Sequence, residues 1–163
     1  MLLRDASVDD LPAIDAIYDH YVATSTCTYQ LEPAGLAARV DWFERHGPRH
    51  PIVVALDGGG GVAGWASLSP FNPRAGYART VEDSVYVRHD RRGAGVGRAL
   101  LAELLDRATA LHHHAIIAGV DATQDASLAL HLAFGFREVG RLREVGFKLD
   151  AFCDVIYLER LLG

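Results

Sequence analysis

Three glycines at every second position, Gly93, Gly95 and Gly97, follow a segment rich in β-branched residues and precede apolar residues at helical spacing. A turn of this kind between a strand and a helix leaves backbone N–H groups without partners, and the helix dipole adds roughly half a positive charge at that end. Because glycines carry no side chain, phosphate oxygens can approach these N–H groups closely. Residues 92–97 are therefore a predicted phosphate-binding turn.

The strand before this turn carries a candidate general base. Side chains alternate along residues 80–87, so Glu82 and Asp83 point to opposite faces of the expected sheet. A substrate ammonium is not a nucleophile, and a carboxylate beside the phosphate site can take its proton directly or through water. An exposed glutamate on a strand is otherwise a solvated surface residue. The neighbouring turn favours a catalytic role for Glu82.

The turn lacks the sequence motifs of two other phosphate-binding loops, the P-loop and the dinucleotide-binding loop. No Lys-Ser or Lys-Thr pair follows Gly97, as a P-loop requires, and the spacing is not that of the G-x-G-x-x-G dinucleotide fingerprint. The run R-G-A-G-V-G instead resembles the R-x-x-G-x-G/A pyrophosphate loop of the GNAT superfamily of N-acetyltransferases. This resemblance implies acetyl-CoA as co-substrate. The implied cofactor-binding residues are Val85, Tyr86, Val87, Arg92, Gly93, Ala94, Gly95, Val96, Gly97, Arg98 and Gln124.

Backbone N–H groups along residues 85–87 are expected to polarise the thioester carbonyl and to stabilise the oxyanion that forms when the amine attacks. A second resemblance lies in A-S-L-A-L-H-L-A-F-G-F at residues 126–136, which is similar to the GNAT helix that follows the fifth strand. His131 stands where that helix usually has a tyrosine. The resemblance implies that His131 protonates the departing thiolate. The alternative is a histidine that packs beside the cofactor without transferring a proton.

A narrower resemblance covers nearly the whole chain, to the phosphinothricin and methionine sulfoximine N-acetyltransferase group. It rests on S-T-C-T-Y at residues 25–29, on P-F-N-P-R-A-G-Y followed by T-V-E-D-S-V-Y-V at residues 70–87, and on G-F-K with D-V at residues 146–155. The group acetylates the α-amino group of small amino-acid analogues. The resemblance implies that Glu82 is catalytic and that Tyr29, Arg74, Gly76 and Tyr77 bind the substrate, with the Arg74 fork on a carboxylate.

The chain departs from this group at two positions. Leu149 stands where some members carry a histidine credited with a catalytic role, and Gln124 stands where an asparagine is common. Members of the group are often dimers. The apolar residues 145–162 could form a homodimer interface, but a core strand explains them equally well.

Three alternatives to an amino-acid acetyltransferase remain. The same fold could acetylate another amine, such as a polyamine, an aminoglycoside or a protein N-terminus. A non-catalytic acyl-CoA sensor would keep residues 92–97 but would not need Glu82. A structural module with a chance glycine turn leaves the spacing of Glu82, the turn and His131 unexplained.

Composition limits the remaining possibilities. The 163 residues are half apolar, which suits one domain spanning residues 1–163 with its own core. A net charge of −5 and a pI near 5.9 argue against a nucleic-acid surface, and no apolar run is long enough to cross a bilayer. Cys27 and Cys153 are far apart, without metal or disulfide spacing, and are expected to be packing residues in a reducing cytoplasm.

No metal site is expected. The run His112, His113 and His114 points in three directions at a helix end, so its members cannot all bind one ion. Their position at the C-terminal end of a helix dipole explains them without a metal.

The pattern of the whole chain predicts an α+β fold, a GNAT-type mixed sheet that is mostly antiparallel and flanked by helices. Expected strands are residues 2–5, 52–56, 62–69, 80–87, 115–120, 136–142 and 152–159. Expected helices begin at Ser7 and after Gly97 and span residues 34–45 and 125–134, with Gly135 as a C-terminal stop. The helix over residues 34–45 is expected to bury Leu36, Val40 and Phe43. Residues 57–61 are expected to be a hairpin turn.

Overall fold

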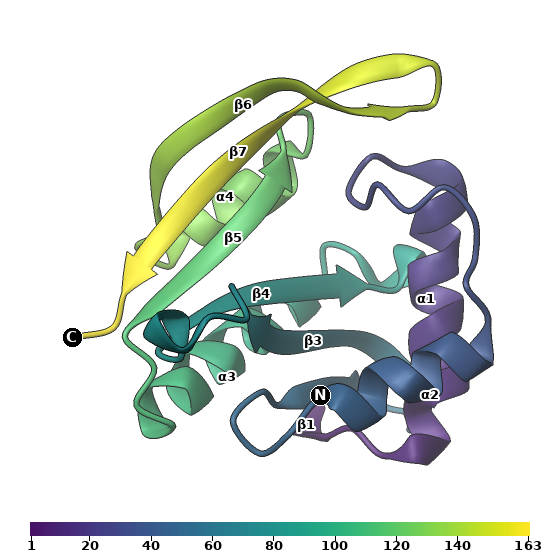
Figure 1. Ribbon diagram of the computed structural model, residues 1–163. Coiled ribbons are helices and arrows are strands. Elements are labelled where there is room, and N and C mark those ends of the chain that lie inside the picture. Colours follow the sequence, from purple (N-terminus) through teal and green to yellow (C-terminus); the bar gives the residue numbers. More distant parts are fainter.

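All strands of the protein lie in one sheet. The computed structural model describes residues 1–163 and contains a seven-stranded sheet of order β1-β2-β3-β4-β5-β7-β6 (Figure 1). Every neighbouring pair is antiparallel except β4 and β5, which are parallel. The strands are β1 (Leu2–Asp5), β2 (Ile52–Leu56), β3 (Val62–Pro70), β4 (Thr80–Val87), β5 (Ala115–Asp121), β6 (Arg137–Lys148) and β7 (Ala151–Leu161). The expected mixed, mostly antiparallel sheet is therefore confirmed.

Four α-helices cover the two faces of this sheet (Figure 1). They are α1 (Leu11–Thr24), α2 (Leu36–Arg45), α3 (Val96–Ala110) and α4 (Asp125–Ala133). Leucines of α3 pack with β2 to β5 and β7 in the larger core, and α4 adds half-buried leucines to it. On the other face, α1 packs on β2 and β3 in a second core. The alternation of β4 connects the two cores, because Val81 faces the first and Tyr86 the second.

The two parallel strands separate soon after they meet. β4 and β5 pair only from Thr80 with Ala115 to Glu82 with Ile117, and beyond these residues the strands diverge (Figure 1). β4 continues to pair with β3 as far as Val87. The edge of β4 that faces β5 is therefore left without a neighbouring strand from residue 83 onward. This opening in the sheet leads directly to the glycine turn.

The expected burial of Leu36 is wrong, because 47% of its surface is exposed. No residue of α2 is fully buried. Arg39 attaches the helix instead: its guanidinium lies 4.7 Å from the Tyr18 ring centroid and 4.8 Å from that of Trp42, and it donates to Asp15 at 3.0 Å. An arginine packed between aromatic rings can hold an amphipathic helix without a deep apolar anchor.

The last two strands are longer than expected. β6 runs to Lys148 rather than ending at residue 142. Its register with β7 shifts between Leu142 and Gly146, and the pairing with β7 then continues to Lys148. Asp154 of β7 secures this bulge by accepting hydrogen bonds from the Arg141 side chain and the Glu144 N–H. Leu149 lies at the tip of the β6-β7 hairpin with a φ of 52° and is 57% exposed.

Local turn predictions hold. Residues 57–61 form the turn between β2 and β3, where Asp57 accepts hydrogen bonds from the N–H groups of Gly59 and Gly61. Gly135 follows α4 with a φ of 80°. His113 is buried and its Nε2 lies 2.8 Å from the Arg49 carbonyl oxygen, so this histidine fastens the end of α3 to the residues before β2. None of the helices is both long and apolar enough to span a membrane.

Candidate active site

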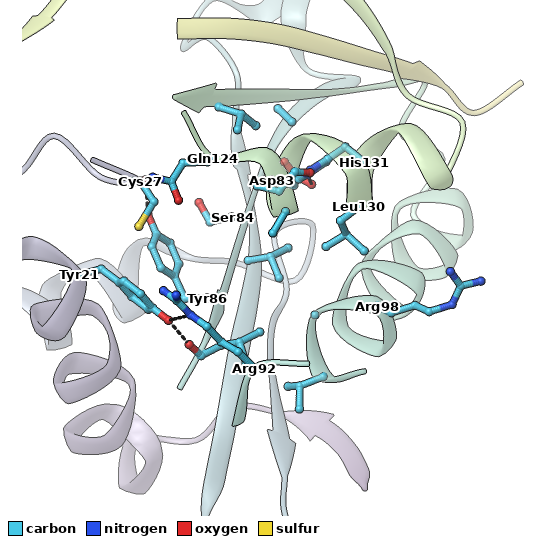
Figure 2. A pocket seen from close by; sticks show the side chains of 18 of the residues that line it. Tyr21, Cys27, Asp83, Ser84, Tyr86, Arg92, Arg98, Gln124, Leu130 and His131 are labelled. Carbon is cyan, nitrogen blue, oxygen red and sulfur yellow. Dashed lines mark hydrogen bonds and ion pairs between the residues drawn. The ribbon is translucent and has the colours of Figure 1, made fainter. Parts of the chain in front are cut away.

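A cavity of about 480 Å³ occupies the opening between β4 and β5 (Figure 2). It reaches from the glycine turn to the part of the sheet where the two strands still pair. Twelve predicted site residues line it: Glu82, Val85, Tyr86, Val87, Arg92, Gly93, Gly95, Val96, Gly97, Arg98, Gln124 and His131. The predicted residues Tyr29, Arg74, Gly76, Tyr77 and Ala94 are not in its lining. The fold thus brings the predicted base and the predicted phosphate turn to one cavity.

The glycine turn presents a row of free N–H groups. Gly93 and Gly95 have φ values of 74° and 80°, a conformation that residues with a side chain adopt at a cost. No backbone N–H of residues 92–98 donates a hydrogen bond within the protein. The first helical residue of α3, Val96, follows at once, so the helix dipole points at the same place. Free donors at a helix N-terminus suit a phosphate or pyrophosphate group.

Arginines frame this turn, and most of them are held by the protein. Arg92 donates from Nε to the Tyr21 hydroxyl at 3.0 Å and lies over the Tyr21 ring (Figure 2). Arg91 pairs with Asp57 and Asp90. Arg98 lies over the Phe134 ring, with its guanidinium pointing away from the other labelled residues (Figure 2). The cavity end at the turn is therefore electropositive, and the backbone supplies most of its directed donors.

The free edge of β4 offers further backbone groups. The N–H of Arg88 donates to Ala63 of β3 at 2.8 Å. Because backbone groups alternate between the two edges of a strand, Val85 and Val87 direct theirs away from β3, toward the cavity. The Tyr21 hydroxyl donates to the Val87 carbonyl, which fits this alternation. Tyr86 contributes its ring, stacked on Trp65 with centroids 4.9 Å apart.

Glu82 lies at the closed end of the cavity. It is the last β4 residue that pairs with β5, and a Cβ placed on Gly119 of β5 would lie 3.7 Å from its Oε1. The missing side chain at Gly119 therefore leaves room for the carboxylate. Burial, with a smaller contribution from the charge of Asp83, raises the pKa of Glu82 above its usual value. A carboxylate with a raised pKa is a stronger base toward an ammonium.

His131 is buried against β4. Its Nε2 lies 3.0 Å from Asp83 Oδ2, and its Nδ1 lies 2.7 Å from the Ser127 carbonyl oxygen (Figure 2). Both partners are acceptors when Asp83 is ionised, so the ring then carries a proton on each nitrogen. Burial lowers the pKa of His131, but the hydrogen bond and charge of Asp83 outweigh this and raise it above its ordinary value.

Gln124 ties the α1-α2 loop to the start of α4. Its Nε2 lies 3.2 Å from Thr26 Oγ1 and 3.4 Å from Ser25 Oγ. Tyr29 of the same loop donates to Asp121 at 2.6 Å. Burial and Asp121 raise the pKa of the Tyr29 hydroxyl, so it remains protonated near neutral pH. Asp121 at the end of β5 and Gln124 just after it thus hold the α1-α2 loop.

The predicted substrate residues of the β3-β4 loop lie outside the cavity lining. Arg74, Gly76 and Tyr77 are exposed, and Arg74 forms no ion pair. Tyr77 lies against Phe71, with ring centroids 5.8 Å apart. The Phe71 N–H donates to the Thr80 carbonyl oxygen at the start of β4. This hydrogen bond closes the loop two residues before Glu82 in the sequence.

Sequence reasoning missed several residues of the site. Tyr21 and Cys27 line the cavity, and Cys27 also packs against the second core, as expected. Asp121, also in the lining, ends the apolar strand β5 and belongs to no sequence motif. Tyr21 is a buried residue of α1. Its hydroxyl forms hydrogen bonds with Arg92 and Val87, and only these contacts indicate that Tyr21 also helps to shape the cavity.

Comparisons with known proteins agree with this geometry. The model of the Acetyltransferase (GNAT) family matches residues 14–136. An L-methionine sulfoximine/L-methionine sulfone acetyltransferase of Pseudomonas aeruginosa is 40% identical over 158 residues, 96% of this chain and 92% of that enzyme. A phosphinothricin N-acetyltransferase of Streptomyces coelicolor is 36% identical and covers 98% of this chain and 95% of its own length.

A solved structure is similar over the same length. The crystal structure of a GNAT superfamily phosphinothricin acetyltransferase from Sinorhizobium meliloti in complex with AcCoA has a TM-score of 0.97 and 40% identity. The similarity covers 99% of this chain and 88% of that one. Fold, motif order and sequence therefore lead to one conclusion: the chain belongs to the GNAT family and is an N-acetyltransferase.

Proposed function

We propose that the protein is a single-domain enzyme that transfers the acetyl group of acetyl-CoA to the α-amino group of a small amino acid or amino-acid analogue. One observation carries this proposal: Glu82 and the free N–H groups of residues 92–98 lie at opposite ends of one cavity. Relatives named for methionine sulfoximine, methionine sulfone and phosphinothricin support the substrate class. Acetylation of such toxic analogues would give resistance to them.

The residues fit acetyl-CoA as co-substrate. The glycine turn would hold its pyrophosphate on backbone N–H groups, with Arg92 and Arg98 beside it and the residues of β4 along the rest of the molecule. Acetyl-CoA supplies the activated acetyl group. The N–H groups of Val85 and Val87 would polarise the carbonyl that the amine attacks. Ala94 lies in the turn, and its N–H is among the free donors.

Two side chains would move protons. Glu82 would take the proton of the substrate ammonium and so free the lone pair that attacks the thioester carbon. Attack forms the nitrogen–carbon bond and a tetrahedral oxyanion, and collapse of this adduct breaks the carbon–sulfur bond, so the sulfur leaves as a thiolate and the nitrogen releases its second proton to water. His131 is the proposed donor to that thiolate, since a ring held between two acceptors carries two protons. A direct donation would require one of these hydrogen bonds to break.

Substrate recognition is assigned to the loops that border Glu82. Arg74 would bind the substrate carboxylate, because its guanidinium has no carboxylate partner within the protein. Gly76 and Tyr77 of the same loop, and Tyr29 of the α1-α2 loop, would form the walls around the substrate side chain. An amino acid held by these loops would place its amino group at the Glu82 carboxylate.

We also propose a cytoplasmic homodimer. Large apolar side chains on the β6-β7 hairpin are 46–67% exposed, and a patch of this kind commonly forms an interface. The patch consists of Leu142, Val145, Phe147, Leu149 and Phe152. Sedimentation equilibrium is expected to give twice the chain mass at micromolar concentration. A monomer would contradict the proposal.

The function is tested by thiol release from acetyl-CoA with a panel of amines. The panel contains phosphinothricin, methionine sulfoximine, methionine sulfone, the common amino acids, spermidine and an aminoglycoside. Turnover confined to α-amino acids is expected. Turnover only with spermidine or the aminoglycoside would overturn the substrate class, and acetyl-CoA binding without any turnover would indicate a sensor.

A further inference from the structure

We propose that Asp121 is a positioning residue that fixes the Tyr29 ring as a rigid wall of the acceptor site. This inference rests on the function proposed above, because it assumes that the substrate binds beside Tyr29. The evidence comes from two strands, β5 and β6, that contact Tyr29 and the residue before it, and neither belongs to the α1-α2 loop that carries Tyr29.

The two carboxylate oxygens of Asp121 bind two different segments, the α1-α2 loop and the turn after β5. Oδ2 accepts the Tyr29 hydroxyl at 2.6 Å, and Oδ1 accepts the Thr123 N–H at 2.9 Å and the Thr123 hydroxyl at 2.5 Å. The residue is 5% exposed and forms no ion pair. A buried carboxylate without a cation needs these donors. The loop and the turn after β5 are therefore joined through one side chain.

The ring and the backbone of Tyr29 are held separately. A Cβ on Gly146 of β6 would lie 3.0 to 3.2 Å from three ring atoms, so the ring lies directly on the glycine backbone. The adjacent Thr28 carbonyl accepts a hydrogen bond from Lys148 Nζ at 2.7 Å, and this lysine is 4% exposed. The hydroxyl of Tyr29 is thus held by β5, and its ring and the neighbouring backbone are held by Gly146 and Lys148 of β6.

The anchor also connects Tyr29 to the proposed base. Asp121 and Gly119 are two residues apart on β5, so both face the same side of the sheet. A Cβ on Gly119 would be 3.7 Å from Glu82 Oε1. One strand therefore sets the position of Tyr29 relative to Glu82. A displacement of about 1 Å in a positioned substrate can cost about 100-fold in rate, so loosening this anchor should affect the amine far more than acetyl-CoA.

The test is a double-mutant cycle of Tyr29→Phe and Asp121→Asn. Asparagine keeps one acceptor oxygen and carries no charge, so it cannot accept from Tyr29 on one oxygen and from Thr123 on the other as the carboxylate does. Each single variant is expected to raise KM for the amine about 10-fold, with KM for acetyl-CoA changed less than about two-fold, and the double variant should lose no more than either single variant. Asp10→Asn is the control, since Asp10 is also a buried, hydrogen-bonded carboxylate but binds Arg4 and the Ser7 N–H at the turn before α1. It should lower thermal stability without changing either KM.

A second readout does not require turnover. With 3-fluorotyrosine incorporated, the resonance missing from the Tyr29→Phe spectrum identifies Tyr29 in the wild type. In Asp121→Asn that resonance should shift and broaden, whereas Asp10→Asn should leave it unchanged. An unchanged resonance, additive losses in the cycle or equal changes in both KM values would overturn the inference. Absence of turnover in the wild type would overturn the proposed function, and the resonance would still decide the role of Asp121.

Discussion

Replacing Glu82 with glutamine is expected to lower kcat for amine acetylation by about 10² to 10⁴, which is the usual contribution of a positioned general base. Glutamine has nearly the same shape but cannot take a proton from the substrate ammonium. Acetyl-CoA affinity should stay within about two-fold, because the glycine turn and the free edge of β4 are unchanged. Thiol-release kinetics and calorimetric titration with acetyl-CoA measure the two quantities.

The pH profile supplies an independent test of the same base. Because burial raises the pKa of Glu82, the wild-type rate should fall on acidification at a higher pH than it would with a solvated glutamate near 4.3. The ascending limb should be absent from the residual activity of Glu82→Gln. A variant that keeps more than a tenth of the wild-type rate would exclude Glu82 as the base.

Stability distinguishes a lost base from a damaged fold. A carboxyl whose pKa is raised in the folded state stabilises the protein below its unfolded pKa, and this contribution is lost as the pH rises through the folded pKa. Above the folded pKa, Glu82 is ionised and half-buried, and this buried charge lowers the free energy of unfolding. Glu82→Gln should therefore melt at or above the wild-type temperature at pH 8. Glu44→Gln, an exposed change on α2, is the control and should change neither the rate nor the melting temperature.

Replacing Gly95 with alanine is expected to weaken acetyl-CoA binding roughly 10-fold. Gly95 has a φ of 80°, and a left-handed conformation costs a residue with a side chain about 1 to 2 kcal/mol. The strain would be relieved by rotating the N–H groups of the turn away from the pyrophosphate. A loss of 1.4 kcal/mol corresponds to about a 10-fold change in Kd, measured by calorimetry.

Gly60→Ala is the matched control for this prediction. Gly60 has a φ of 81° and, like Gly95, has open space where a Cβ would go, but it lies in the β2-β3 turn outside the cavity. It should show a similar loss of stability with unchanged acetyl-CoA affinity. If the two variants bind acetyl-CoA equally well, the turn at residues 92–98 is not the pyrophosphate site.

Short-range features of the site could be predicted from the sequence. The glycine spacing at residues 92–97 predicted free donors before a helix, and the alternation of residues 80–87 placed Glu82 and Asp83 on opposite faces. Both depend on backbone geometry over a few residues. Leu36 shows the limit of such patterns: its helical spacing suited burial, but Arg39 between aromatic rings determines how α2 is attached.

By itself, the sequence determined the glycine turn before a helix, the orientation of Glu82 on its strand and the mixed α+β sheet, because each depends on the spacing of neighbouring residues. Only the tertiary structure decided that β4 and β5 separate after Glu82 and leave a cavity. It also brought together residues distant in sequence, pairing Asp83 with His131 and Tyr29 with Asp121. Such contacts depend on how strands and loops pack in three dimensions, and the spacing of residues along the chain does not predict that packing.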